Sequence, residues 1–338
     1  MGMKKFLLRF FLLASPIIAI VAFFSIVDVF MLYYPDVRTA PFQSIRFNGL
    51  SQNLLAVNLF SQQNADEKYN AFIFGNSRSR AFQGKVWCTY LDDECASFHF
   101  GAGGTGLYDA YKKIRYLDEV VDTIRHALVV VDENFLVLNT NSKELMQMTP
   151  PLVSKESKFL YYLGFYRLKL DVSFMWAYFD FLLFRTYRPY MKGGIVPPDF
   201  KGLFNFTNGD IIYPSEALIQ ADSSTYYQGL IDRGEFFSRP APKKEHPVTE
   251  TEVTQLMKIR AVFDRHKTDY KIIVSPIYDQ VSLGAHHLRL LVEIFGETRV
   301  YNFSGKNPLT EPIGNFSENI HYRPHVGTQI LEQIYGGE

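Results

Sequence analysis

A serine, a histidine and an acid that could together perform nucleophilic chemistry lie near opposite ends of this 338-residue sequence. Ser77 follows a short apolar run that ends in Gly75-Asn76, and His321 lies three residues after Glu318. A serine hydroxyl attacks a carbonyl carbon when a histidine takes its proton and an acid orients the imidazole. Ser77, His321 and Glu318 are therefore the candidate nucleophile, base and acid. A serine directly after a strand also caps the following helix in many α/β proteins, so a structural role remains open.

Alternating apolar runs and helical patterns indicate the elements that must position these residues. Strand-like runs are expected at residues 71–74, 97–100, 127–131, 270–274 and 299–302, with helical stretches such as 106–121 and 249–266 between them. This alternation predicts an α/β fold with a parallel sheet covered by helices on both faces. Ligands bind such sheets at the carboxyl ends of the strands, which is the edge where Ser77 would stand.

Four further residues are expected at the same edge. Gly103 and Gly104 belong to a glycine-rich turn after the second predicted strand, Asn134 follows the third, and Arg78 flanks the serine. Glycines let backbone N–H groups approach a reacting oxygen closely, and an arginine can bind a carboxylated or phosphorylated acceptor. The alternatives are a tight strand–helix turn for the glycines and a solvated helix charge for Arg78.

The two ends of the chain together resemble the SGNH (GDSL-like) hydrolase superfamily. Gly75-Asn76-Ser77-Arg78 is similar to the family's first block, and Glu318-Asn319-Ile320-His321 to its last Asp-x-x-His block, with Glu in place of Asp. The resemblance implies a three-layer α/β/α sandwich with a parallel five-stranded sheet, SGNH/flavodoxin-like. It also implies that Gly103 or Gly104 and the Asn134 side chain donate to the oxyanion. Asn134 follows two acids here, whereas the family's third block reads Gly-x-Asn-Asp.

The N-terminal segment is expected to cross a membrane. Lys4, Lys5 and Arg9 precede an uncharged run from Phe10 to Val27, which is about long enough to span a bilayer core. The positive-inside rule then places the N-terminus in the cytoplasm and the remainder outside. A cleavable signal peptide is the alternative. The predicted organisation is an anchor at 1–34, a polar irregular stem at 35–68 and an SGNH-like catalytic domain at 69–338.

A large insertion, at about 136–247, interrupts the predicted catalytic domain between its third and fourth strands. Its first half is aromatic and is interrupted by charges, which excludes a second membrane span. A helical cap that packs on the domain and a lid or docking surface for a membrane partner or a sugar polymer are both compatible with this pattern. The remainder, 186–247, is rich in proline, glycine and polar residues and predicts long loops.

Composition narrows the possible partners. The chain has 35 basic and 35 acidic residues, a balance that gives no reason to expect nucleic acid. Its two cysteines, Cys88 and Cys95, have no neighbouring histidine pair and make a poor zinc site, and no metal or cofactor is expected. The two thiols are either bridged or separately buried, and an oxidising compartment outside the cytoplasm favours the disulfide.

Within the SGNH superfamily, the closest resemblance is to the membrane-anchored branch that acylates cell-envelope polymers, such as the alginate O-acetylation and DltD-like proteins. It implies O-acyl transfer, in particular O-acetyl transfer, to a cell-surface or exported polysaccharide through an acyl-enzyme on Ser77. It further implies a domain in the periplasm and a multi-span membrane acyltransferase as partner. An extracytoplasmic esterase or deacetylase with the same residues is one alternative, and a non-catalytic scaffold of a polymer export complex is another.

Overall fold

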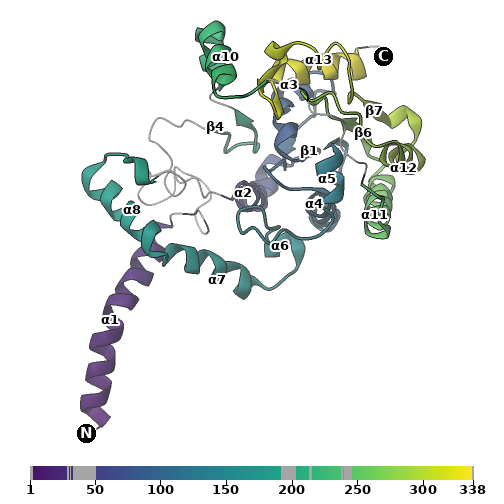
Figure 1. The fold of residues 1–338 in the computed structure, drawn as a ribbon. Coiled ribbons are helices and arrows are strands. Elements are labelled where there is room, and N and C mark those ends of the chain that lie inside the picture. The colour runs from purple at the N-terminus through teal and green to yellow at the C-terminus, as the bar shows by residue number, and fades with distance from the viewer. Residues whose placement is uncertain are drawn as a thin grey trace.

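The computed structural model describes residues 3–28, 30, 32, 51–191, 203–212, 215–236, 239 and 246–336. Its centre is a five-stranded parallel sheet of order β2-β1-β3-β6-β7 (Figure 1). The strands are β1 (Ala71–Gly75), β2 (Ser97–His99), β3 (His126–Val131), β6 (Asp269–Val274) and β7 (Val300–Asn302). The α/β class and the parallel sheet are confirmed, and each strand agrees with its predicted run to within one residue at either end.

Helices pack on both faces of this sheet. Phe72 and Phe74 contribute to a core with α2 (Gln52–Glu67), α4 (Leu107–Val120), α11 (Glu250–His266) and α12 (Ala285–Phe295). Ala71 and Ile73 point into a second core with α3 (Gly84–Cys88) and α13 (Pro324–Tyr335). Burial on both faces explains why β1 and residues 127–131 of β3 are continuous apolar runs without polar alternation.

Helix α2 corrects the expectation of an irregular stem. Residues 52–67 of the predicted stem form this helix, which begins after Ser51, whose side chain accepts the N–H of Leu54. Its inner face is fully buried through Leu54, Val57 and Phe60. The helix was missed because its apolar residues are interspersed with Asn and Gln that also reach the interior. Residues 35–50 of the stem lie outside the described residues.

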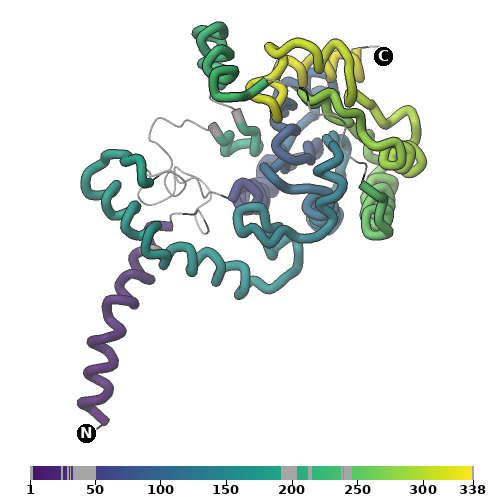
Figure 2. The backbone as a smooth tube through the Cα atoms, viewed as in Figure 1, coloured from purple at the N-terminus to yellow at the C-terminus, as the bar shows by residue number. Residues whose placement is uncertain are grey.

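The insertion also carries more structure than the sequence indicated. It includes α5 (Glu133–Val137), α6 (Pro151–Ser154), α7 (Lys158–Lys169), α8 (Val172–Phe184), η2 (Pro189–Met191), β4 (Leu203–Phe204), β5 (Ile211–Ile212), α9 (Ser215–Ala221) and α10 (Ser223–Asp232), although α5 begins before it. Strands β4 and β5 form an antiparallel pair. The expectation of long loops over 186–247 is therefore wrong for β4, β5, α9 and α10. Figure 2 shows α7 and α8 as two consecutive tubes that extend from the sheet domain toward the N-terminal helix.

Helix α1 (Met3–Val27) extends away from the rest of the chain, as Figures 1 and 2 show. Its stretch Met3–Phe23 has a mean hydropathy of 2.4 and none of its most apolar window is buried. At 1.5 Å per residue, the helix is about 37 Å long, compared with about 30 Å for a hydrocarbon core. It is thus long and apolar enough to cross a membrane, a property that it shares with N-terminal signal sequences.

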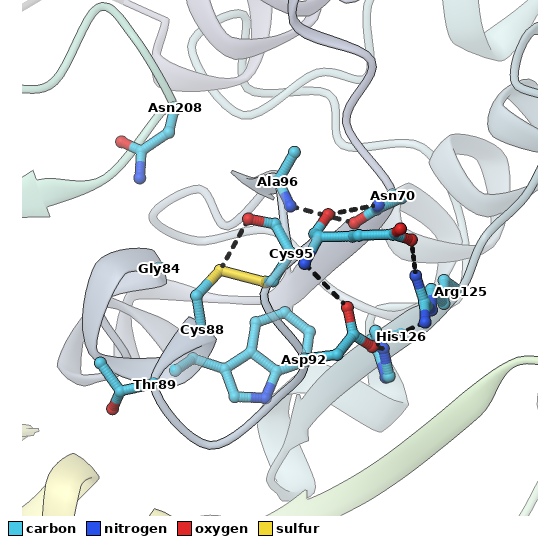
Figure 3. Close-up of a disulfide and its surroundings, with 12 residues drawn as sticks. Asn70, Gly84, Cys88, Thr89, Asp92, Cys95, Ala96, Arg125, His126 and Asn208 are labelled. Carbon is cyan, nitrogen blue, oxygen red and sulfur yellow. Dashed lines mark hydrogen bonds and ion pairs between the residues drawn. A yellow bond between two sulfur atoms is a disulfide. The ribbon is translucent and has the colours of Figure 1, made fainter.

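A disulfide joins Cys88 at the end of α3 to Cys95 before β2 (Figure 3). Their Cα atoms lie 5.6 Å apart, within the range that a bridge requires. The bond closes the loop that leads from α3 back into the sheet, and Asp92 within this loop pairs with Arg125 beside β3. The predicted bridge between the two cysteines is confirmed.

Candidate active site

The turn after β1 presents Ser77 at the carboxyl edge of the sheet. Asn76 caps the short helix η1 (Ser77–Ala81) by accepting the N–H of Arg78 on its side chain. Gly75 has to be glycine, because a Cβ there would lie 2.8 Å from the Cβ of Ser79 and 2.9 Å from the carbonyl oxygen of Val130. The strand can therefore lie close to β3 and turn sharply into η1, which begins at Ser77.

A second segment from the far end of the chain brings the base and the acid. Strands β8 (Phe316–Glu318) and β9 (His321–Tyr322) form an antiparallel pair with a tight connection. Nε2 of His321 lies 2.7 Å from Oγ of Ser77, and Nδ1 of His321 contacts the carboxylate of Glu318. The expected contact between Ser77 and His321 is confirmed, and Glu318 reaches the ring despite being one methylene longer than Asp.

The electrostatics of this trio favour an ionised acid beside the imidazole. The hydrogen bond from His321 holds the pKa of Glu318 below its ordinary value, although partial burial opposes this shift. The charges of His321 and Arg80 lower it further. The side chain of His321 is nearly buried whereas that of Glu318 is about two-fifths exposed. A carboxylate that stays ionised can hold the ring with Nδ1 protonated and Nε2 facing Ser77.

Arg78 connects the nucleophile turn to the loop that carries the acid and the base. Its guanidinium donates to the carboxylate of Asp132 at 2.7 Å and to the carbonyl of Ile320 at 3.2 Å. Asn76 donates to the same oxygen of Asp132 at 2.6 Å, and Asp132 in turn caps α5. With its side chain only 13% exposed, Arg78 is not the solvated helix charge of the alternative interpretation. We call these three residues, Asn76, Arg78 and Asp132, the Arg78 clasp.

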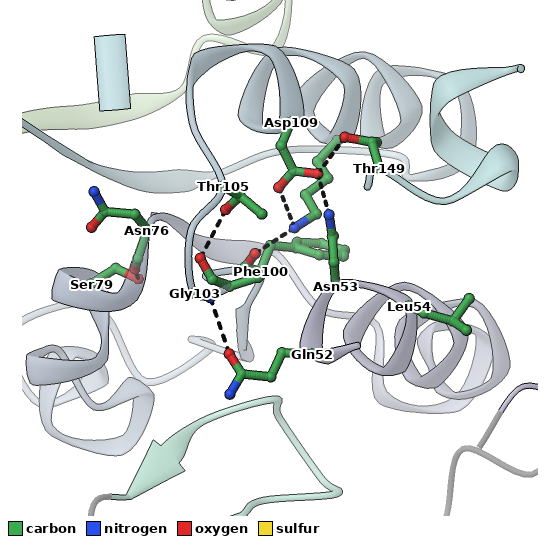
Figure 4. Close-up of polar contacts among 12 residues, drawn as sticks. Gln52, Asn53, Leu54, Asn76, Ser79, Phe100, Gly103, Thr105, Asp109 and Thr149 are labelled. Atoms are coloured by element: carbon green, nitrogen blue, oxygen red, sulfur yellow. Dashed lines mark hydrogen bonds and ion pairs between the residues drawn. The ribbon is translucent and has the colours of Figure 1, made fainter. Parts of the chain in front are cut away.

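Of the predicted oxyanion donors, Gly103 is engaged elsewhere and Asn134 is exposed. The N–H of Gly103 donates to Oε1 of Gln52 on α2 at 3.0 Å (Figure 4). Gly104 has a φ of +72° and is packed so that a Cβ would lie 2.5 Å from the Gln147 amide. Asn134 lies exposed on α5. The structure thus gives the two glycines roles in a tight strand–helix turn, and their proposed contacts to a reacting oxygen stay a prediction.

A pocket of about 190 Å³ lies near the candidate triad, although Ser77, Glu318 and His321 are not among the residues that line it. Asn319 and Ile320, the residues between Glu318 and His321, form part of its wall together with Arg78 and Asn134. Its remaining lining comes from the ends of β3 and β6, from the segments after β3, β6 and β7, and from His246 before α11. The pocket therefore lies at the carboxyl edge, where doubly wound sheets bind their ligands, and two of its lining residues, Arg78 and Ile320, are the chain neighbours of Ser77 and His321.

A second serine–histidine–acid chain lies behind the first and was not predicted. Oγ of Ser79 is 2.9 Å from Nε2 of His99, and Nδ1 of His99 is 3.2 Å from the carboxylate of Asp210. Asp210 also accepts the N–H of Gly84 and an N–H of the Asn208 side chain. All three members of the chain are at most 5% exposed, so no substrate reaches them. Sequence separations of 20 and 111 residues left no local pattern from which to infer this network.

A buried ion pair ties α2, α4 and the insertion together on the other side of the glycine-rich turn (Figure 4). Asp109 pairs with Lys113 at 2.7 Å and accepts from Asn53 of α2 and Thr149 of the insertion. Lys113 also donates to the carbonyl of Phe100 at the end of β2. Complete burial lowers the pKa of Lys113, and the Asp109 carboxylate opposes that shift. This network is structural and fixes the turn that carries Gly103.

Comparison of the sequence with family models and with curated proteins finds no match in either. Within the described ranges, no group of three or more His, Cys, Asp and Glu residues is arranged to hold a metal ion. The interpretation of the site therefore depends on the geometry of Ser77, His321 and Glu318 and on their position at the edge of the sheet.

Proposed function

We propose that the chain is a membrane-anchored, SGNH-like serine acyltransferase that moves an acyl group, in particular acetyl, onto a hydroxyl of a cell-surface or exported polysaccharide. The observation that carries this proposal is the contact of 2.7 Å between Ser77 and His321, with Glu318 on the other ring nitrogen. Strand order β2-β1-β3-β6-β7 with helices packed on both faces supports the three-layer SGNH arrangement.

In the first half-reaction, Ser77 attacks the carbonyl carbon of the acyl donor. His321 takes the hydroxyl proton on Nε2 and passes it to the leaving group, so that an ester on Ser77 and the protonated leaving group result. Glu318 stabilises the imidazolium that forms between these two proton transfers. The Arg78 clasp holds the nucleophile turn against the loop of Glu318 and His321 during this step.

In the second half-reaction, a sugar hydroxyl enters beside the acyl-enzyme. His321 removes its proton, the hydroxyl oxygen attacks the Ser77 ester, and the proton returns to the Ser77 oxygen as the product ester leaves. Water in place of the sugar completes the same cycle as a hydrolase. An extracytoplasmic esterase or deacetylase is therefore the second candidate, favoured by the same triad geometry.

The proposed location follows from α1 and the disulfide. With Lys4, Lys5 and Arg9 on the cytoplasmic side, α1 would cross the inner membrane once and leave the catalytic domain in the periplasm. The bridge between Cys88 and Cys95 suits an oxidising compartment. Since acetyl-CoA is cytoplasmic, a multi-span acyltransferase would have to deliver the acyl group, as the family resemblance implies.

The test is an acyl-transfer assay with the full-length protein in detergent or nanodiscs. We expect a chromogenic acetyl ester to leave an acetyl group on the Ser77 peptide, detected by mass spectrometry, and acetylated product to form when an oligosaccharide is added. Free acetate as the sole product would overturn the transferase and support the esterase. If polysaccharide acetylation is lost in the deletion strain but unchanged in cells that carry Ser77→Ala, the result would support the alternative of a non-catalytic scaffold.

A further inference from the structure

We propose that the two consecutive helices α7 and α8, which we call the α7–α8 pair, lie in the membrane–water interface beside α1, with one face of α8 inserted into the headgroup–acyl boundary of the lipid. This face consists of Val172, Trp176, Phe179 and Leu183, and we call it the α8 apolar stripe. The occupant of the surface is thus the bilayer itself. The inference goes beyond the acyltransferase proposal, because it depends on α1 as a membrane span and not on Ser77.

The exposure pattern of α8 is that of a helix with a lipid-facing side. Members of the α8 apolar stripe are separated by four, three and four residues and share one helix face, with exposures of 74%, 69%, 41% and 75%. The opposite face, Phe174, Ala177, Tyr178 and Phe181, is buried. An isolated exposed apolar residue needs no explanation, but a continuous stripe with a tryptophan marks a contact with another molecule or a membrane.

The α7–α8 pair is attached to the C-terminal end of α1. Phe23 in α1 packs on Phe179 with ring centroids 5.4 Å apart, and on Tyr178 at 6.1 Å. Phe30, just after α1, stacks on Phe174 at 5.5 Å. Figure 1 shows α8 where α1 meets the rest of the chain, with α7 leading from there to the sheet domain. If α1 crosses the bilayer, these contacts place α8 at its surface.

Length and charge fit an interfacial position rather than a second span. The 13 residues of α8 measure about 20 Å, short of the roughly 30 Å of a hydrocarbon core. Its one acidic residue, Asp180, is paired with Arg188 at 2.8 Å. Lys158, Arg167 and Arg185 are exposed around the α7–α8 pair and can contact anionic headgroups. Phe159 and Leu160 at the start of α7 are also exposed.

The chain contains a natural probe for this arrangement. Of its two tryptophans, Trp87 is fully buried in the sheet domain and Trp176 is 69% exposed in the α8 apolar stripe. The full chain would be reconstituted into vesicles of phosphatidylcholine and phosphatidylglycerol with or without brominated phosphatidylcholine, a collisional quencher of tryptophan. We expect brominated lipid to remove the Trp176 share of the emission. The Trp176→Phe variant, which keeps an aromatic ring, should show little quenching.

A pair of exposed substitutions tests the stripe without touching the core. Leu183→Gln should shift Trp176 toward water and reduce its quenching by brominated lipid at least twofold. Ser173→Gln, at an exposed position outside the stripe, should leave the quenching unchanged. Equal emission in brominated and ordinary vesicles, in protein that floats with them, would overturn the lipid proposal and favour a membrane protein as occupant of the stripe. If acyl transfer is absent while the quenching is as expected, the proposed function at Ser77 is wrong and the lipid contact of α8 is still supported.

Discussion

Two serines of one turn, Ser77 and Ser79, each contact a histidine whose other ring nitrogen contacts a carboxylate. The two serines differ in whether a substrate can reach them. Ser79, His99 and Asp210 are sealed in the interior, whereas Ser77 faces the edge of the sheet beside a pocket. Geometry of the hydrogen bonds alone would not distinguish a catalytic chain from a structural one. Burial does, because a nucleophile has to meet its substrate.

This contrast predicts opposite outcomes for two matched substitutions. Ser77→Ala should abolish acyl-enzyme formation, by at least about 10³-fold, and leave the melting temperature nearly unchanged. Ser79→Ala should keep the nucleophile but leave Nε2 of His99 without its hydroxyl partner in the interior, at a cost of about 1–3 kcal/mol in the free energy of unfolding. Ester turnover and urea denaturation of both variants check this. An active Ser77→Ala protein would refute the assigned nucleophile.

The role of Glu318 as the acid can be tested by changing the charge and the length of its side chain. Glu318→Gln should leave the fold intact and lower turnover by up to about 10⁴-fold, because the amide can hold the wrong tautomer of His321. Glu318→Asp, which restores the acid usual in the resembled family, should retain more activity than the amide variant, and His321→Ala should retain the least. Turnover of an acetyl ester by the three variants gives the ranking. Full activity of Glu318→Gln beside an inactive His321→Ala would reduce the site to a Ser–His dyad.

The lowered pKa of Glu318 also predicts how stability depends on pH. A carboxyl whose pKa is lower in the folded chain stabilises the fold above its unfolded value of 4.5, and this contribution is lost as the pH falls through the lowered folded pKa. The stability difference between the wild type and Glu318→Gln should therefore be constant near neutral pH and shrink below about pH 4.5. Urea denaturation of both proteins from pH 7 to pH 3 measures it. A difference that grew on acidification would contradict the hydrogen bond from His321.

At the scale of elements, the Arg78 clasp joins the end of β1, the end of β3 and the β8–β9 pair. Arg78→Lys keeps the charge but loses the planar fork that reaches Asp132 and the carbonyl of Ile320 together. We expect turnover to fall by up to about 100-fold with a smaller change in KM, because the base shifts relative to Ser77. Steady-state kinetics of the variant measure both constants. A pure increase in KM would instead make Arg78 a ligand of the substrate.

The elements that were predictable from sequence are those with local signals. Strands β1 and β3 are buried on both faces and consist almost entirely of apolar residues, and α11 starts with a complete capping box at Thr249 and Glu252. Helix α2 was missed because Asn53 looks like a surface residue but is buried and donates to Asp109. Its polarity is satisfied by a partner 56 residues away, which no local pattern reveals.

The same reasoning explains which site residues could be inferred. Ser77, Glu318 and His321 lie in short segments whose chemistry is visible in the sequence, and the fold only has to bring them to one edge. The donor role of Gly103 depended on where its N–H points, and that direction is set by Gln52 on a helix that was not expected. His99 and Asp210 have no motif, because a buried hydrogen-bond partner can come from any segment that reaches the same place.

At the scale of the whole molecule, α1, the α7–α8 pair and the sheet domain follow one another in space. The α7–α8 pair contacts the C-terminal end of α1, and residue Thr149 just before α6 is tied into the buried network of Asp109. If this pair lies in the membrane interface, it holds the sheet domain near the bilayer. Such a position suits an enzyme whose acyl donor is delivered by a membrane partner, as proposed above.

The side of the membrane on which the domain lies can be read from its cysteines. The chain has only Cys88 and Cys95, and the two are bridged. If α1 exports the domain to an oxidising compartment, a maleimide–polyethylene glycol reagent should label neither thiol in denatured full-length protein, and both after reduction. A version without residues 1–27 stays in the reducing cytoplasm and should be labelled twice before reduction. Gel mobility resolves zero, one and two labels. Full-length protein that is labelled twice without reduction would place the domain in the cytoplasm, where a polysaccharide acceptor outside the cell could not reach Ser77.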